Sequence, residues 1–372
     1  MKTACAQDAE LLRSAMTTDG SSQDTPTPVT VLTGYLGAGK TTLLNRILSE
    51  DHGRRYAVIV NEFGKVGIDN ELITSADEEL FEMNNGCICC TVRGDLIRTV
   101  HGLLAKSGTF DAIIVETTGL ADPGPVAQTF FVDGFLKSRT TLDSVTTVVD
   151  ARHIGLRLDD SREAVEQIAF ADQIVLNKTD LVSEQDLVEV EQRLRKLNPL
   201  APIHRAQRSN VPLEAILERK SFDLDRITTL EPEFLNPGHG EAGHVHDEDC
   251  DDEHDHGHEH HDHTHDEEIK SVSLTSDRPM DRKKITRWIT DLTQNQGENI
   301  LRAKGIIDIA GNDRRLVFQA VHMVLEGDLQ REWKRDEKRI SRIVFIGREL
   351  DAEALKSSFE ACAANPAEAI GA

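Results

Sequence analysis

The stretch Gly34-Tyr-Leu-Gly-Ala-Gly-Lys-Thr-Thr42 follows a short β-branched run and precedes a helix-forming segment. It fits the pattern G-x-x-x-x-G-K-[ST], in which glycines let successive backbone N–H groups turn inward around a phosphate. Lys40 is expected to reach the β- and γ-phosphate oxygens, and the Thr41 hydroxyl to bind Mg²⁺. The sequence therefore predicts a phosphate-binding loop (P-loop) lined by Gly34, Gly37, Ala38, Gly39, Lys40, Thr41 and Thr42.

Short apolar runs on either side of this loop alternate with helical segments. Their nearly continuous apolar character favours strands of a parallel sheet that is covered on both faces. A helix is expected to start at Ser183, with Asp186 as its capping partner. We therefore expect an α/β fold, with a P-loop NTPase domain and a mostly parallel sheet over residues 29–222. The expected strands are residues 29–33, 56–60, 112–115, 145–149 and 173–176.

The rest of the chain divides into three parts. Residues 1–28 lack periodicity and are expected to form a disordered arm. Residues 223–268 have few apolar side chains and are expected to form a linker, because they cannot bury a core. Over residues 269–372, strands mix with helices around 284–292 and from residue 351, which predicts a smaller α+β domain. The strands expected in it are residues 269–274, 300–309, 315–321 and 342–346.

The chain is strongly acidic. Lys and Arg number 42 against 65 Asp and Glu, a net charge of −23, which argues against a surface that tracks nucleic-acid phosphates. Residues 239–268 alone hold thirteen acids, ten of the fifteen histidines and no Lys or Arg. This run is expected to bind several divalent ions weakly, unless it is only a solubilising linker. Its candidate ligands are His244, His246, His254, His256, His258, His260, His261, His263 and His265.

The expected location follows from two further features of the sequence. No apolar run reaches the roughly 18 to 20 residues needed to span a bilayer. The N-terminus has neither the basic nor the apolar region of a signal peptide. We therefore expect a cytoplasmic protein without a membrane partner.

The sequence Asn177-Lys-Thr-Asp180 directly follows a predicted strand and indicates guanine recognition. Asp180 can accept hydrogen bonds from the ring N–H and the exocyclic amine of guanine together, whereas adenine would present a lone pair there. Sites built to satisfy such bonds discriminate by factors on the order of 10⁴. Asn177 is expected to bond the imidazole-ring nitrogen of the purine, and the stem of Lys178 to lie against the base plane.

Glu116-Thr-Thr-Gly119 follows the predicted strand at residues 112–115. A nucleotide-binding sheet places such a segment beside Mg²⁺ and the γ-phosphate. Glu116 can hold Mg²⁺ through water or orient the attacking water, and the Gly119 N–H can contact the γ-phosphate. The expected catalytic residues are thus Lys40, Glu116 and Gly119. No arginine stands out as an arginine finger, so slow intrinsic hydrolysis is expected.

Three cysteines, Cys87, Cys89 and Cys90, lie within four positions. Two or three thiolates at this spacing can converge on one ion, and such soft ligands favour Zn²⁺, Co²⁺ or Cu(I). The cluster lies between the P-loop and Glu116, where P-loop GTPases carry their first nucleotide-sensing segment. Incidental packing of the cysteines is the alternative.

Together these motifs resemble the CobW-like family of P-loop GTPases, metallochaperones related to the nickel-inserting GTPases of urease and hydrogenase maturation. The resemblance covers roughly residues 29–350. Its markers are GYLGAGKTT at 34–42, VNEFGKVGID at 60–69, NNGCICC at 84–90, ETTGLADP at 116–123, NKTD at 177–180, the His-rich insertion, RAKG at 302–305 and SRIVFIGREL at 341–350.

The resemblance implies that Cys87, Cys89 and Cys90 carry the transferred metal and that Glu62 lies near the nucleotide in switch I. It also implies that the C-terminal part is a CobW C-terminal domain. Members of the family often have an acidic residue after N-E-F-G, where this chain has Lys65. The resemblance therefore implies no carboxylate ligand for the metal at that position.

The implied function is a GTPase that uses GTP and Mg²⁺, carries a divalent metal and delivers it to a client metalloprotein or apo-enzyme, with a homodimer also conceivable. Zinc is favoured, because the Cys and His complement suits it. Cobalt delivery for cobalamin synthesis or metalloenzyme activation is the close alternative. A metal-buffering or storage protein with a regulatory GTPase site is another. A small-molecule kinase is disfavoured, because it leaves the N-K-T-D and the cysteines unexplained.

Overall fold

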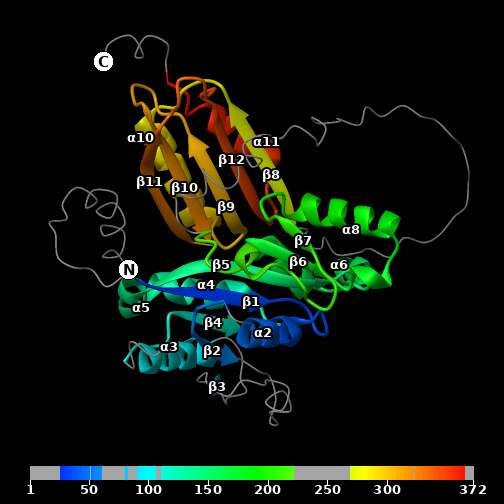
Figure 1. The fold of residues 1–372 in the computed structure, drawn as a ribbon. Coiled ribbons are helices and arrows are strands. Elements are labelled where there is room, and N and C mark those ends of the chain that lie inside the picture. Colours follow the sequence, from blue (N-terminus) through cyan, green and yellow to red (C-terminus); the bar gives the residue numbers. More distant parts are fainter. Residues whose placement is uncertain are drawn as a thin grey trace, which may run out of the picture.

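The chain, shown in Figure 1 as a computed structural model, is built around two β-sheets, one in each half of the sequence. The structure describes residues 26–50, 52–60, 80–82, 90–105, 110–221, 269–321 and 323–364, and for residues 80–82 and 90–93 it describes the backbone alone. Within these ranges, no helix combines the length and the apolar character needed to cross a bilayer.

The N-terminal half contains a seven-stranded sheet of order β3-β2-β4-β1-β5-β6-β7. All adjacent pairs in it are parallel, so the carboxyl ends of the strands meet at one edge. This confirms the predicted parallel sheet. Its strands are β1 (Thr27–Thr33), β2 (Tyr56–Val60), β3 (Leu80–Glu82), β4 (Ala112–Glu116), β5 (Thr140–Asp150), β6 (Gln173–Asn177) and β7 (Ile203–Arg205).

Helices cover both faces of this sheet, which is why its strands are apolar throughout. They are α2 (Lys40–Ser49), α3 (Cys90–Leu104), α4 (Pro123–Val132), α5 (Gly134–Arg139), α6 (Ile154–Asp160), α7 (Arg162–Phe170) and α8 (Glu184–Leu197). One face packs against α2, and the other packs against α3, α4, α5 and α7. The capping box predicted at Ser183 and Asp186 is present at the start of α8.

The C-terminal half contains a five-stranded antiparallel sheet of order β11-β10-β9-β12-β8. Its helices α10 (Arg282–Gln296) and α11 (Ala352–Glu360) pack on one face through Ile285, Ile289, Leu355 and Phe359. The predicted α+β architecture is thus confirmed. The strands are β8 (Ile269–Ser276), β9 (Ile300–Ile307), β10 (Arg314–Val321), β11 (Val324–Glu332) and β12 (Ser341–Arg348).

The two halves share an apolar core. Ile269, Val321 and Ile346 of the C-terminal sheet belong to the same buried cluster as Ala169 and Phe170 of α7. Figure 1 shows the C-terminal sheet above the parallel sheet, near β5, β6 and α8. Because this contact is continuous and apolar, the two halves pack together as parts of one folded unit.

Buried ion pairs also join the two halves. Arg302 of β9 pairs with Asp172, which follows α7, and the Lys304 ammonium lies 3.4 Å from the same carboxylate. Arg348 of β12 pairs with Glu166 of α7. Arg302, Lys304 and Asp172 are at most 2% exposed, so these charges depend on one another for compensation.

Candidate nucleotide and metal site

The P-loop connects β1 to α2 at the carboxyl edge of the parallel sheet. Gly39, just before α2, has a φ of 112°, a backbone conformation that residues with a Cβ rarely adopt. A Cβ on Gly39 would also lie 2.4 Å from Nδ2 of Asn177. The Lys40 ammonium donates to the Gly34 carbonyl oxygen at 2.7 Å. The strand, loop and helix expected around this motif are therefore present, and Thr41 and Thr42 follow in the first turn of α2.

Asn177 ends β6 and ties the P-loop to a loop that follows β7. Its Nδ2 donates to the Ala38 carbonyl at 2.9 Å and to the Ser209 hydroxyl at 3.1 Å, while its Oδ1 accepts from the Ser209 N–H at 2.7 Å. Both N–H groups of the amide are therefore used within the protein. In this structure the side chain fixes the loop, and the bond expected from Asn177 to the purine stays a prediction. Sequence reasoning missed Ser209, because no motif marks it.

Lys178 follows with a φ of 61°, in the left-handed region. Its ammonium donates to Oδ2 of Asp150, at the end of the neighbouring strand β5, at 2.7 Å. Burial by itself would raise the pKa of Asp150, but the hydrogen bonds from Lys178 and His153 outweigh burial and hold that pKa below its usual value. Asp150 is therefore an ionised partner of Lys178 at neutral pH. The sequence singled out Lys178 but not Asp150.

Glu116 ends β4 next to the P-loop strand and is 6% exposed. The residue after it, Thr117, donates from its hydroxyl to the Thr33 hydroxyl at 2.8 Å, and from its N–H to the Leu32 carbonyl at 2.9 Å. Both bonds lead back to β1. The expected catalytic segment is thus anchored beside the P-loop from its first residues.

Thr118 and Gly119 bring this segment closest to the P-loop. The hydroxyl oxygen of Thr118 is buried and has no hydrogen-bond partner in the structure described here. A Cβ on Gly119 would lie 2.6 Å from the backbone nitrogen of Leu36, so only glycine fits at this approach. A buried hydroxyl left without a partner at this place suits a site that is completed by an oxygen-rich ligand.

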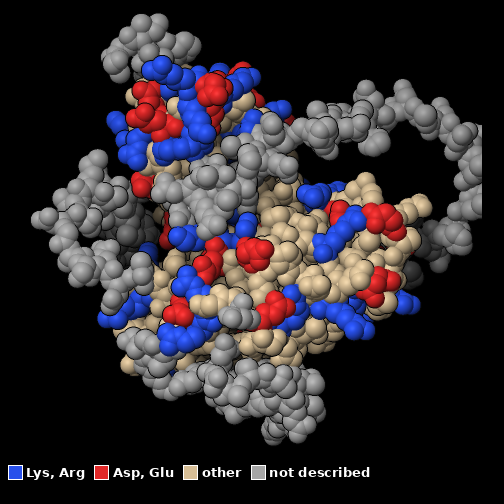
Figure 2. All heavy atoms as spheres, viewed as in Figure 1, with Lys and Arg blue, Asp and Glu red and all other residues tan. Residues whose placement is uncertain are grey.

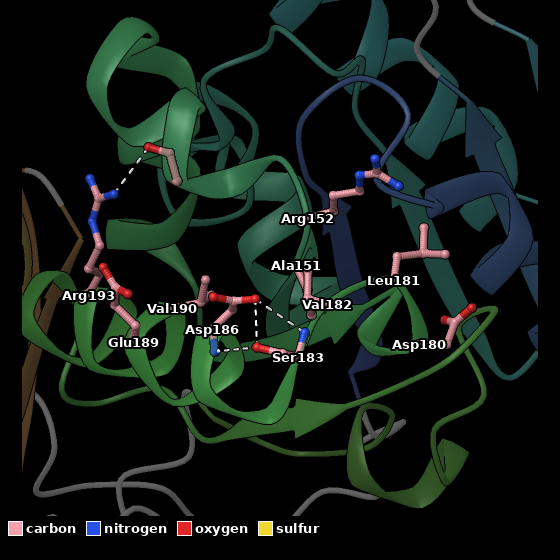
Figure 3. Close-up of a pocket in the computed structure, with 11 residues that line it drawn as sticks. Ala151, Arg152, Asp180, Leu181, Val182, Ser183, Asp186, Glu189, Val190 and Arg193 are labelled. Atoms are coloured by element: carbon pink, nitrogen blue, oxygen red, sulfur yellow. Dashed lines mark hydrogen bonds between the residues drawn. The ribbon is translucent and has the colours of Figure 1, made fainter.

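Asp180, the expected guanine-selecting residue, is exposed and lines an open cavity of about 680 Å³. Figure 3 shows its carboxylate at one end of this cavity, away from the hydrogen-bonded Ser183 and Asp186. Arg152 from the loop after β5 lines the cavity as well. The side chain of Asp180 is therefore accessible to a ligand at the carboxyl edge of β6.

The expected metal ligands can be placed only in part. Cys90 is the first residue of α3, and β3 ends at Glu82 on the same sheet edge as the P-loop strand. Cys87, Cys89, Glu62 and the histidines of residues 244–265 lie outside the described residues. Among the described residues, no group of three or more His, Cys, Asp or Glu side chains is placed to hold a metal ion.

The charges on the described surface are mixed. On the face in Figure 2, Lys and Arg side chains are interspersed with Asp and Glu over both halves of the molecule. Such a surface differs from the continuous basic stripe that nucleic-acid binding requires.

Comparison with known proteins extends this description over most of the chain. Residues 28–205 match the family described as CobW/HypB/UreG, nucleotide-binding domain, and residues 269–363 match the cobalamin synthesis protein cobW C-terminal domain. The chain is 35% identical over 339 residues to the zinc chaperone YjiA of Escherichia coli, covering 90% of this chain and 98% of that protein. It is 42% identical over 214 residues to the zinc-regulated GTPase metalloprotein activator 1 of Schizosaccharomyces pombe, covering 55% and 52%.

A solved structure shows the same fold. The crystal structure of Zn(II)-bound YjiA GTPase from E. coli superposes with a TM-score of 0.69 at 30% identity, covering 92% of this chain and all of that one. The chain therefore belongs to the CobW family, with a nucleotide-binding domain of the P-loop GTPase fold followed by a CobW C-terminal domain.

Proposed function

We propose that this protein is a GTP-hydrolysing metallochaperone that carries zinc and delivers it to a client metalloprotein. The observation that carries the proposal is the meeting of the P-loop, Glu116 and the loop from Asn177 to Asp180 at one edge of a parallel sheet. β3 ends at the same edge, eight residues before α3 begins at Cys90. The choice of zinc is supported by relatives described as a zinc chaperone and a zinc-regulated metalloprotein activator.

GTP binding follows from the side chains at this edge. The Lys40 ammonium, now bonded to a carbonyl of its own loop, is placed to exchange that bond for phosphate oxygens. Asp180 selects guanine through the ring N–H and the exocyclic amine. Gly119 closely approaches Leu36 of the P-loop, and its N–H is proposed to contact the γ-phosphate.

The residues present also fit Mg²⁺. The Thr41 hydroxyl and the Glu116 carboxylate are oxygen ligands of the kind that this hard cation prefers. The partnerless hydroxyl of Thr118 nearby is a further group that an ion-bound water can satisfy. When bound, the ion neutralises charge on the phosphate oxygens. The chain itself orients the phosphates through Lys40 and the N–H groups of the P-loop.

Zinc is the cargo, and Cys87, Cys89 and Cys90 are its proposed ligands. Thiolates at this spacing suit a tetrahedral zinc site, with the fourth ligand coming from elsewhere. In this proposal GTP orders the segment that contains Glu62, the cysteines converge, and hydrolysis loosens the site. Coupling of this kind is a difference in zinc affinity between two nucleotide states.

The remaining expectations stay predictions. We expect residues 29–222 and 269–372 to be the two domains, residues 223–268 to be a linker and residues 1–28 to be an arm. The histidines of the linker would hold further ions weakly. A cytoplasmic location is expected as well, and a homodimer is one of the assemblies that the proposal allows. Co²⁺ delivery and a metal-buffering role are the competing functions.

A transfer experiment tests the proposal. The protein is loaded with one equivalent of Zn²⁺ and GTP and mixed with a chromophoric zinc chelator, and zinc transfer and phosphate release are followed together. We expect faster zinc transfer with GTP than with a non-hydrolysable analogue. In Cys89→Ser, the slow, nucleotide-linked phase, which is the part of the transfer whose rate depends on the nucleotide, should be lost. A variant lacking residues 239–268 should keep that phase. Equal transfer rates with both nucleotides would rule out hydrolysis-driven delivery, and loss of all binding in the deletion variant would favour a buffer.

A further inference from the structure

Asp150 at the end of β5 is held from several sides. Its Oδ2 accepts from the Lys178 ammonium at 2.7 Å and lies 2.9 Å from Nδ1 of His153. Its Oδ1 accepts from the backbone N–H groups of Arg152 at 3.0 Å and His153 at 3.3 Å. The Asp150 side chain is 13% exposed. Asp150 is therefore fixed before any ligand arrives, and its charge is directed at Lys178.

The position of this pair is set by the sheet. Asp150 lies opposite Asn177 in the register of the parallel strands β5 and β6, so Lys178 leaves the sheet one residue beyond its partner. With its backbone in the left-handed region, Lys178 directs its side chain back across the strand ends to Asp150. The ammonium is thereby held at the end of β5.

The pair also borders the P-loop. Lys178, Asp150 and His153 line a cavity of about 470 Å³, and Tyr35 and Gly37 of the P-loop line it too. The aliphatic stem of Lys178, which runs from the end of β6 to the end of β5 beside the P-loop, provides an apolar surface of fixed position. A free lysine side chain would have to lose its rotamer freedom on binding, whereas a clamped one has already lost it.

We propose that Asp150 is a positioning residue for guanine-nucleotide binding: it clamps Lys178 so that the lysine stem forms a preset wall for the purine. This inference rests on the proposed function, because it assigns the nucleotide site to GTP. Asp150 touches no part of the nucleotide in this account. Its effect passes entirely through Lys178.

A double-mutant cycle tests the clamp. Dissociation constants for GDP and GTP are measured for the wild type, Asp150→Asn, Lys178→Met and the double variant. Asn retains an oxygen for the two backbone N–H groups, and Met retains an apolar stem without the charge. We expect each single variant to bind GDP on the order of tenfold more weakly, and the double variant to bind no more weakly than Lys178→Met. Asp291→Asn, which removes an exposed partner of Arg287 in α10, is the control and should bind as the wild type does.

The outcomes separate the two claims. Unchanged GDP binding in Asp150→Asn or in Lys178→Met, or fully additive losses in the double variant, overturns the clamp. If Asp150→Asn does not fold, as judged by its thermal unfolding, the result for Lys178→Met decides. The wild type is titrated with ATP in the same series. A wild type without preference for GTP over ATP contradicts the proposed function, whereas an intact preference with no effect of Asp150→Asn contradicts only the clamp.

Discussion

Nε2 of Gln167 donates to the carbonyl oxygen of Gly119 at 3.2 Å, which connects α7 to the segment beside the P-loop. The same nitrogen donates to the Ala121 carbonyl at 3.1 Å. One residue earlier in α7, Glu166 pairs with Arg348 of the C-terminal sheet. A single helix therefore contacts both the expected γ-phosphate-sensing segment and the C-terminal domain.

Removing the Gln167 side chain should impair hydrolysis while sparing nucleotide affinity. In Gln167→Ala, the carbonyls of Gly119 and Ala121 lose their shared donor, so the segment that follows Glu116 is less well placed. We expect the rate constant of GTP hydrolysis to fall on the order of tenfold or more, since small misplacements of catalytic groups are costly. Single-turnover phosphate release, together with GDP titration, measures both quantities.

The matched control for this change is Gln192→Ala, an exposed position on the neighbouring helix α8. It should hydrolyse GTP at the wild-type rate. Hydrolysis unchanged in Gln167→Ala would mean that the bond to Gly119 plays no part in positioning the segment.

The charge of Asp172 should be essential for the contact between the two domains. In Asp172→Asn, Arg302 and Lys304 stay buried without their shared carboxylate. Breaking a buried ion pair from one side costs about 3–5 kcal/mol, so the free energy of unfolding in urea should fall by that order. In Asp159→Asn, which removes an exposed partner of Arg193, the loss should be no more than about 1 kcal/mol. Similar losses in both variants would show that the buried pair contributes no more than a surface one.

Asp180→Asn should change which base the site accepts. The asparagine amide can donate to the second carbonyl of xanthine but no longer accepts the two N–H groups of guanine. We expect GTP affinity to fall by a factor on the order of 10² or more, and xanthosine triphosphate affinity to rise above that of the wild type. Competition titrations with GTP and xanthosine triphosphate measure the two affinities. Retained preference for GTP would show that Asp180 does not read the base.

The parts of the fold that the sequence predicted are those with local signals. The P-loop, the strand before Asn177 and the capping box at Ser183 each depend on residues close together in the chain. The buried parallel strands were recognisable because both of their faces are apolar. Short-range chemistry of this kind can be read without knowing the fold.

The parts that were missed depend on partners far away in the chain. Strand β11 (Val324–Glu332) carries a glycine and several charges, and it becomes a strand through its pairing with β10. Strand β7 is three residues long. Ser209, Asp150 and Gln167 look like ordinary loop or helix residues, and only their tertiary contacts give them a role. The sequence contains these residues but no local pattern that distinguishes them.

Glu337 should make the C-terminal domain sensitive to acid. Burial would raise the pKa of Glu337, but bonds from the Arg331 side chain and the Lys334 N–H, with the charge of Arg315, outweigh it and lower that pKa to about 2. A carboxyl with a lowered pKa stabilises the fold above its unfolded pKa near 4.5, and this stabilisation is lost as the pH falls toward 2.

Urea unfolding at pH 7, 4.5 and 3 measures this contribution. We expect Glu337→Gln to be less stable than the wild type at pH 7 and to lose less stability between pH 4.5 and 3. Asp336→Asn at the exposed neighbouring position should keep the wild-type profile. Parallel profiles for Glu337→Gln and the wild type would contradict the assignment.

The most direct test of the central claim is the zinc affinity of the protein in two nucleotide states. Zinc is titrated against a competing chelator in the presence of GDP and then of a non-hydrolysable GTP analogue, using protein that lacks residues 239–268 so that only the cysteine site is counted. Co²⁺ is titrated in parallel. We predict that the analogue tightens zinc binding by about tenfold or more, in the range of typical coupling free energies, and that Cys87→Ser abolishes the difference. Equal zinc affinities with GDP and with the analogue would contradict a nucleotide-controlled metallochaperone.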